Sequence, residues 1–348
     1  MKMTSEGSGG RADAQRYANL AIEQAVRGAG YLNKKLEPWK KGDEIVIYAD
    51  TGTDPVVWQV FQEACNNYGL VPIVVIVNRP KHDYANAPLA AFEAMKHSSV
   101  PGTIYVSSLG LNHGKHGQAL SRMGKRNIIA EHITVDMMSR GLKWFEPEVV
   151  AEYRKWDEKV KNAGIGIKSV RITCQHGSDF TVAVGERPHY GTPGCTAFMH
   201  PMGAGQVPSE AHLCLPNVGS GDGVLYCDLT AHHVGTVQEH MKFTIKKGKI
   251  VSIEGGHEAE EFRRWLTDYG DENSWLLGEI AFGTNPWARS SGTMREDRKI
   301  WGTMHIGWGQ NLDVGGSIDS VIHWDFAMRS PTCYADGKMI AKDGKILL

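Results

Sequence analysis

The sequence lacks an excess of charge of either sign. Its 348 residues carry 38 Lys and Arg against 39 Asp and Glu, a formal net charge of −1. A nearly neutral chain has no global field with which to bind a nucleic acid or an anionic bilayer. We therefore expect neither nucleic acid nor membrane as a partner, and a small molecule as the substrate.

Paired cysteines and long hydrophobic runs are also missing. The six Cys form no CxxC pair and no spacing typical of a zinc knuckle. No run reaches the roughly 18 apolar residues of a membrane span, and the leading segment MKMTSEGSGGRADAQ has no apolar core of a secretory signal. These absences exclude a disulfide-stapled miniprotein and predict buried thiols and a cytoplasmic location.

What the sequence does contain is typical of a folded globular protein. Hydrophobic residues make up 41% of the chain and ten residues are Trp, which excludes a disordered chain. At roughly 150 residues per domain, the length predicts about two domains. The 15 His and 40 Gly are numerous, and many lie after residue 170. This asymmetry favours a functional site in the C-terminal half.

Strands and helices are predicted to alternate in the N-terminal half. A helix at about residues 12–28 precedes the buried strand EIVIYADTG, the helix VVWQVFQEACNNYG and the strand VPIVVIV. The alternation continues to the helix PEVVAEYRKWDEKVKNAG. It predicts an α/β domain, residues 1–165, with a doubly wound, mostly parallel sheet. The turn ADTGTDP lacks both GxGxxG and GxxxxGKS, which favours an N-capped turn over a phosphate loop.

The C-terminal half, residues 166–348, follows a different pattern. SVRITCQHGSDFTVAVG predicts a hairpin with Gly177 and Ser178 at its tip, and GVLYCDLT and MKFTIKKGKIVSIEGG predict further strands. EAEEFRRWLTDYG predicts one amphipathic helix among them. We expect an α+β domain with strands of mixed direction, in which a site is built while the first domain serves as a platform.

The segment SVIHWDF carries the strongest local signal for a site. His323 and Asp325 lie two residues apart, so on a strand both side chains project from one face, as metal ligands would. A His and an Asp at this spacing can also form a structural hydrogen bond, so the pair by itself does not establish a metal site.

Three further segments strengthen the metal interpretation. They place Glu279 in LLGEIAFGTNP, His305 in WGTMHIGWGQN and Glu210 in VPSEAHLCLP. Three carboxylates and two imidazoles can hold two divalent ions about 3.5–4 Å apart. The predicted metal ligands are therefore Glu210, Glu279, His305, His323 and Asp325.

Other residues are assigned ordinary roles. Two neighbouring pairs of His are expected to be exposed or to cap helices. Cys195 and Ser320 are not expected to be nucleophiles, because they lack a GxSxG elbow or a nearby base. Two Trp near His305 are expected to pack in the core, and three Arg are expected on the surface. The residues concerned are His113, His116, His232, His233, Cys195, Ser320, Trp301, Trp308, Arg289, Arg295 and Arg329.

From about residue 165 to the C-terminus, these segments in this order resemble the thermophilic-metalloprotease family of aminopeptidases, the aminopeptidase T and aminopeptidase S type. HGSDF, VGSGDGVL and GKIVSIEGGHEAEEF resemble the family as well. The resemblance implies that the five residues above are its metal ligands, and that subunits pair as a homodimer. One departure is Leu312, which occupies the position of a family tyrosine seven residues after His305.

The same family includes 2,5-dihydroxypyridine 5,6-dioxygenase-like proteins, which are similar to this chain in GGHEAEEFR and NLDVGGS. The resemblance implies one iron there, held by two His and one Asp. The first of those ligands, a His, aligns with Glu279, and the positions of Glu210 and His305 carry no ligand in that enzyme.

Because all five positions are kept, the sequence predicts a metal-dependent hydrolase of a small peptide-like or cyclic amide. Two divalent ions, Zn, Mn or Co, would acidify a shared water, and Glu210 or Glu279 would accept its proton. Two alternatives stay open. One is a mononuclear Fe(II) ring-cleaving dioxygenase using His305, His323 and Asp325 on a hydroxylated N-heterocycle. The other is a non-enzymatic binding protein on an inactive metalloprotease scaffold.

Overall fold

The computed structural model describes residues 7–29, 35–81, 83–98, 102–112, 114–185, 197–199 and 210–348. The chain divides into two compact units, Met1–Glu152 with Gly194–Pro208, and Tyr153–Pro193 with Ser209–Leu348. This division lies within helix α6 (Pro147–Gly164), whereas the boundary expected from the sequence follows that helix. Of the helices that the structure describes, none has the length and apolar character needed to cross a membrane.

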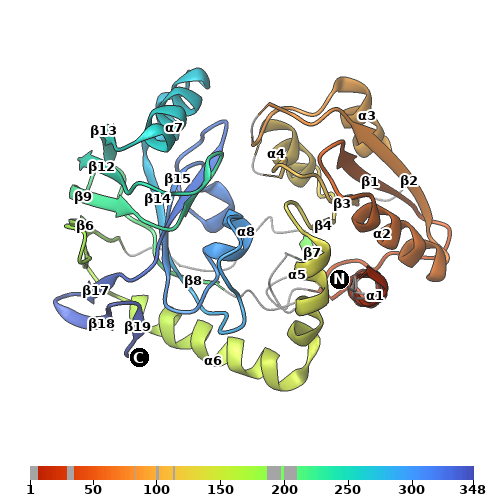
Figure 1. Ribbon diagram of the computed structural model, residues 1–348, viewed down its shortest axis with the longest axis horizontal. Coiled ribbons are helices and arrows are strands. Elements are labelled where there is room, and N and C mark those ends of the chain that lie inside the picture. The colour runs from red at the N-terminus through yellow and green to blue at the C-terminus, as the bar shows by residue number, and fades with distance from the viewer. Residues whose placement is uncertain are drawn as a thin grey trace, which may run out of the picture. The chain divides into compact units, whose positions relative to one another are not determined.

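Unit 1 alternates strands and helices as the sequence predicts (Figure 1). Its elements are α1 (Gly7–Val26), β1 (Glu44–Asp50), α2 (Pro55–Asn67), β2 (Val71–Val77), α3 (Leu89–His97), β3 (Thr103–Tyr105), α4 (Lys115–Arg122), β4 (Asn127–Ile129), α5 (Val135–Gly141), the 3-10 helix η2 (Leu142–Phe145), the first part of α6, and β7 (Ala197–Met199).

The strands of unit 1 form one parallel sheet in the order β2-β1-β3-β4-β7. The predicted α/β class with a mostly parallel sheet is confirmed. Asp54 caps α2, and its side chain accepts a hydrogen bond from Val56 N at 2.9 Å. The ADTGTDP turn is therefore the N-capped connection that the sequence favours.

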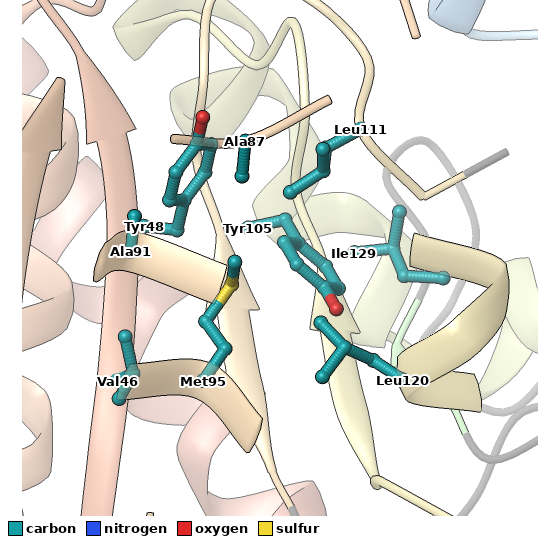
Figure 2. Packing of buried hydrophobic residues seen from close by; sticks show 9 residues of the cluster. All are labelled: Val46, Tyr48, Ala87, Ala91, Met95, Tyr105, Leu111, Leu120 and Ile129. Carbon is teal, nitrogen blue, oxygen red and sulfur yellow. The ribbon is translucent and has the colours of Figure 1, made fainter. Parts of the chain in front are cut away.

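The core of unit 1 forms because β1 is buried on both faces. Val46 and Tyr48 alternate with Ile45 and Ile47, so neighbouring residues point to opposite sides of the sheet. Val46 and Tyr48 lie in one cluster with residues of β3, β4, α3, α4 and the segments that precede the two helices, namely Tyr105, Ile129, Ala91, Met95, Leu120, Ala87 and Leu111 (Figure 2). The two helices thereby cover this face of the sheet.

Unit 2 is built mainly from strands. Its elements after α6 are β5 (Ser169–Thr173), β6 (Asp179–Ala183), β8 (Glu210–Cys214), β9 (Asp222–Cys227), β10 (Thr230–Ala231), β11 (Gly235–Thr236), β12 (Met241–Lys246), β13 (Lys249–Glu254), α7 (His257–Asp268), η3 (Glu272–Trp275), β14 (Leu277–Gly283), α8 (Met294–Asp297), β15 (Met304–Gly309), η4 (Leu312–Val314), β16 (His323–Met328), β17 (Thr332–Ala335), β18 (Lys338–Lys342) and β19 (Lys345–Ile346).

These strands form two sheets, β11-β10-β16-β15-β14-β8 and β13-β12-β9-β6-β5-β17-β18-β19. The expectation of mixed strand direction is wrong, because the pairings between the described strands of both sheets are antiparallel. The predicted hairpin is confirmed: β5 pairs with β6, and Gly177 has φ 102° in the connection. Strands joined by short turns run antiparallel.

An aromatic layer joins the two sheets of unit 2. Phe243 on β12 stacks on Phe326 of β16 with ring centroids 4.5 Å apart, and it meets Phe262 of α7 edge-on at 6.0 Å. The five described cysteines are free thiols, and four of them are buried. Cys195 lies outside the described residues.

Replacing Phe243 with Ala should lower the free energy of unfolding of unit 2 by about 3–5 kcal/mol, because a fully buried ring is lost from the layer between the sheets. Denaturant unfolding measures this change. The control is Val251→Ala on the neighbouring strand β13, where the side chain is 53% exposed and the change should stay within about 0.5 kcal/mol. Equal losses in both variants would contradict the packing described.

Candidate metal centre

One face of the β8-β14-β15-β16 sheet carries the chemistry of unit 2. In the strand register, Glu279 and Asp325 both pair with Gly307, which lies between them on β15. His323 pairs with Gly309, while His305 pairs with Ala281 and Ala327. Polar side chains thus alternate with glycine and alanine across the strands. Because a glycine or alanine fills little space, side chains from outer strands can converge above the middle ones.

The opposite face of the same strands is aromatic. Trp308 and Trp324, which alternate along β15 and β16 with the residues above, stack with ring centroids 5.7 Å apart and are fully buried. Trp324 Nε1 donates a hydrogen bond to Ser274 O at 2.8 Å. The period of two along each strand therefore separates a polar face from a packed core and fixes which side each candidate ligand faces.

Glu279, His323 and Asp325 form the tightest group of potential ligands. Their ligand atoms lie within 4.8 Å of one another, and all three residues are buried. Gly307 makes this approach possible. A Cβ atom at residue 307 would lie 2.4 Å from Glu279 Cγ, 2.9 Å from His323 Cε1 and 3.0 Å from Asp325 Oδ1.

Hydrogen bonds from other elements fix the orientation of this group. His323 Nδ1 donates to the carbonyl oxygen of Gln310 at 2.7 Å, which directs Nε2 toward Asp325 Oδ1, 3.2 Å away. The backbone N–H of Asp325 donates to His232 Nδ1 at 2.7 Å. An imidazole that gives its second N–H to a carbonyl has the tautomer and orientation of a metal ligand.

Burial and mutual charge act on the group in opposite directions. Burial alone raises the pKa of Glu279, but the imidazoles of His212 and His323 outweigh it and hold that pKa well below its usual value. Burial raises the pKa of Asp325 too, and Arg298 and His323 reverse the effect. Conversely, the two carboxylates outweigh burial and raise the pKa of His323. Both carboxylates are therefore ionised and available to a cation.

Glu210 lies beside this group in a different environment. Its Oε2 is 3.1 Å from Arg298 Nε, and its Oε1 is 3.1 Å from Lys299 Nζ. Arg298 also forms an ion pair with Asp325 through Nη1. His305 Nε2 lies 3.9 Å from Glu210 Oε2 and 3.6 Å from Glu279 Oε1. All five residues predicted from the sequence therefore meet in one cluster, and Glu210 is held there by two cations.

Three members of the cluster were missed from the sequence. His212 Nε2 is 3.2 Å from Glu279 Oε2, and its side chain is 18% exposed, the most open of the imidazoles around that carboxylate. The signal was present, since Glu210 and His212 lie two residues apart on β8, as His323 and Asp325 do on β16. Arg298 and Lys299 gave no signal, because a run of charged residues is typical of an exposed segment.

The remaining sequence assignments have mixed outcomes. His232 is buried and accepts a hydrogen bond from the backbone N–H of Asp325, so the expected exposed or capping role is wrong. Arg295 is buried too, contrary to its expected surface position. Trp308 packs as expected, as does Trp301, which meets Trp156 edge-on at 5.5 Å. Leu312 is 38% exposed in η4. His113 and Cys195 lie outside the described residues.

The donor set suits a divalent cation. Two carboxylates and one correctly oriented imidazole offer oxygen and nitrogen ligands in a buried position. His305 is fully buried, and within the described part of the chain neither of its ring nitrogens has a hydrogen-bond partner. A buried imidazole without such a partner is costly, and a nearby cation would satisfy it. The geometry could hold a metal ion on one sheet face.

Two solved structures share the fold. The structure of 2,5-dihydroxypyridine dioxygenase from Pseudomonas putida KT2440 has a TM-score of 0.66 and 18% identity, covering 97% of each chain. Wild-type AmpT from Thermus thermophilus has a TM-score of 0.63 and 17% identity, covering 96% of this chain and 100% of AmpT. At these identities the likeness establishes the fold alone.

Sequence comparison favours the dioxygenase over AmpT as the relative of this chain. The 2,5-dihydroxypyridine 5,6-dioxygenase of Pseudomonas putida is 26% identical over 192 residues, which are 52% of this chain and 54% of that protein. The match thus spans about half the length of this curated relative. A family model described as 2,5-dihydroxypyridine 5,6-dioxygenase matches residues 34–348.

These matches overturn the main functional prediction. The sequence was interpreted as a metallohydrolase acting on C–N bonds, with aminopeptidase or amidohydrolase activity, and that assignment is wrong because the family and the curated relative are dioxygenases. The prediction failed because this chain has a suitable residue at all five ligand positions of the aminopeptidase pattern. That match favoured aminopeptidases over dioxygenases, although both share the fold. The chain belongs to the NicX family, that of 2,5-dihydroxypyridine 5,6-dioxygenase.

Proposed function

We propose that this chain is an iron(II)-dependent dioxygenase that opens the ring of a hydroxylated pyridine. The observation that carries the proposal is the buried group of Glu279, His323 and Asp325, with ligand atoms within 4.8 Å of one another, in a chain whose residues 34–348 match the dioxygenase family. The substrate class follows from the names of the family and of the curated relative.

Glu279, His323 and Asp325 would hold the ion, with His305 beside them. Imidazole and carboxylate ligands suit ferrous iron, and non-haem iron centres of oxygenases combine these two ligand types. When bound, such an ion supplies the one-electron and O2 chemistry that amino-acid side chains lack. This ligand set contains one His and two carboxylates, because Glu279 contributes a second carboxylate. It therefore differs from a set of two His and one carboxylate.

The surrounding residues have distinct tasks in this proposal. Gln310 and His232 orient His323 and Asp325 through the hydrogen bonds described above. His212, which is the more exposed imidazole, holds a proton at Nε2 against Glu279. Its pKa is raised, since Glu279 outweighs the effect of burial.

The activity test uses the purified protein loaded with Fe(II) without oxygen and then mixed with 2,5-dihydroxypyridine in isotopically labelled O2. We expect oxygen consumption, loss of the ring absorbance, and both labelled atoms in the product. A folded, iron-loaded protein that consumes no oxygen with any of a series of hydroxypyridines would refute the proposal. So would a product that takes oxygen from water.

Replacing His323 or Asp325 with Ala should remove bound iron and lower turnover by more than about 100-fold, because each change deletes a ligand and leaves its neighbours uncompensated. Metal analysis and oxygen uptake measure the two effects. The control is His257→Ala on α7, because the His257 side chain is 83% exposed. This variant should keep its bound iron and its turnover. Full iron content in the His323 and Asp325 variants would rule out the assigned ligands.

Replacing Gly307 with Ala should weaken iron binding about 10–100-fold while the protein stays folded, since the new methyl group would lie within 3.0 Å of all three assigned ligands. Titration of the metal-free protein with Fe(II), together with circular dichroism, measures this. Ala281→Gly, on the same sheet face, removes volume without adding any and is the matched control. Unchanged affinity in Gly307→Ala would show that the ion is held elsewhere.

A further inference from the structure

Glu210 is the one predicted ligand whose two oxygens both face fixed cations. Oε1 lies 3.1 Å from Lys299 Nζ and accepts a hydrogen bond from Arg298 Nη2 at 3.4 Å, while Oε2 lies 3.1 Å from Arg298 Nε. A divalent ion binds a carboxylate oxygen at about 2.0–2.2 Å. It cannot take this position while the guanidinium and ammonium groups stay where they are.

The two cations are buried and anchored through their backbone. Lys299 is fully buried and Arg298 is 4% exposed. The N–H of Lys299 donates to Glu296 O at 2.8 Å, and its carbonyl accepts from Asn285 N at 2.9 Å. Thr303 Oγ1 donates to Arg298 O at 3.3 Å. Neither side chain can swing into solvent without disrupting this segment, so both groups stay beside Glu210.

Charge counting shows what the cations do. The formal charges of Glu210, Glu279, Asp325, Arg298 and Lys299 sum to one negative charge. An imidazole that binds the ion must be neutral and adds nothing to this sum. One divalent ion turns this into a single positive charge. A second ion would add two more positive charges in a buried region, where uncompensated charge is strongly unfavourable. If Arg298 and Lys299 were uncharged, the three carboxylates and two divalent ions would sum to one positive charge. This is the same net charge that the native cluster has with one ion.

We propose that Arg298 and Lys299 restrict this centre to a single divalent ion by occupying, with their own charges, the side of the cluster where Glu210 would otherwise hold a second one. The inference rests on the metal centre of the proposed function. Glu210 acts here as the counter-ion that keeps the two cations in place, and it does not ligate the ion.

The test counts metal ions with Mn²⁺ as the probe, using elemental analysis and electron paramagnetic resonance on the folded, metal-loaded chain. The native protein should bind one Mn²⁺ and give the resolved signal of an isolated ion. The double variant Arg298→Met/Lys299→Met should bind two and show the signal of a coupled pair, since ions that share such a site lie about 3.5–4 Å apart. The control Lys242→Met/Arg264→Met removes one half-buried and one exposed cation of unit 2, and this variant should still bind one Mn²⁺.

Two native ions, or a folded double variant that still binds one, would overturn the inference and leave the proposed function standing. A native protein that binds none would instead refute the metal centre itself. If the double variant does not fold, Glu210→Gln decides. Retention of one ion in this variant supports the counter-ion role of Glu210, and loss of the ion shows that Glu210 is a ligand and overturns the inference.

Discussion

The centre depends on a steric constraint at the middle of one sheet. Glu279 and Asp325 belong to strands on either side of β15, and their side chains converge only because Gly307 has no side chain between them. Antiparallel register fixes this arrangement, since a shift of one residue would direct every ligand into the aromatic face. The backbone of three adjacent strands thus sets the ligand geometry, which is a more rigid support than a loop provides.

The same sheet face concentrates charge that would be unfavourable in isolation. Buried carboxylates persist there because imidazoles, a guanidinium and an ammonium compensate them at short range. Burial lowers the pKa of Lys299 to about 8, even though the carboxylate of Glu210 raises it. In the proposal above, these two buried cations limit how much additional positive charge the cluster can accept.

The fold itself does not choose the reaction. This chain superposes over most of its length on both a dioxygenase and AmpT, with similar TM-scores. A shared fold therefore does not identify a reaction, which depends on the side chains that each chain carries. In this chain Arg298 and Lys299 face Glu210 and add positive charge to the cluster of unit 2.

The sequence by itself determined the parallel sheet of unit 1, the hairpin of unit 2 and five residues of the central cluster. Periodicity of two placed His323 and Asp325 on one face, and apolar neighbours marked Glu279 and His305 as buried polar groups. These signals are local, so they can be recognised without knowing which strands are neighbours. Tertiary structure decided the rest. The run from Arg295 to Lys299 is entirely buried, although five consecutive charged residues predict an exposed segment. Only the packing of this segment against β8 and β16 supplies the carboxylates that make its burial possible, and pairing between distant strands cannot be recognised from one strand alone.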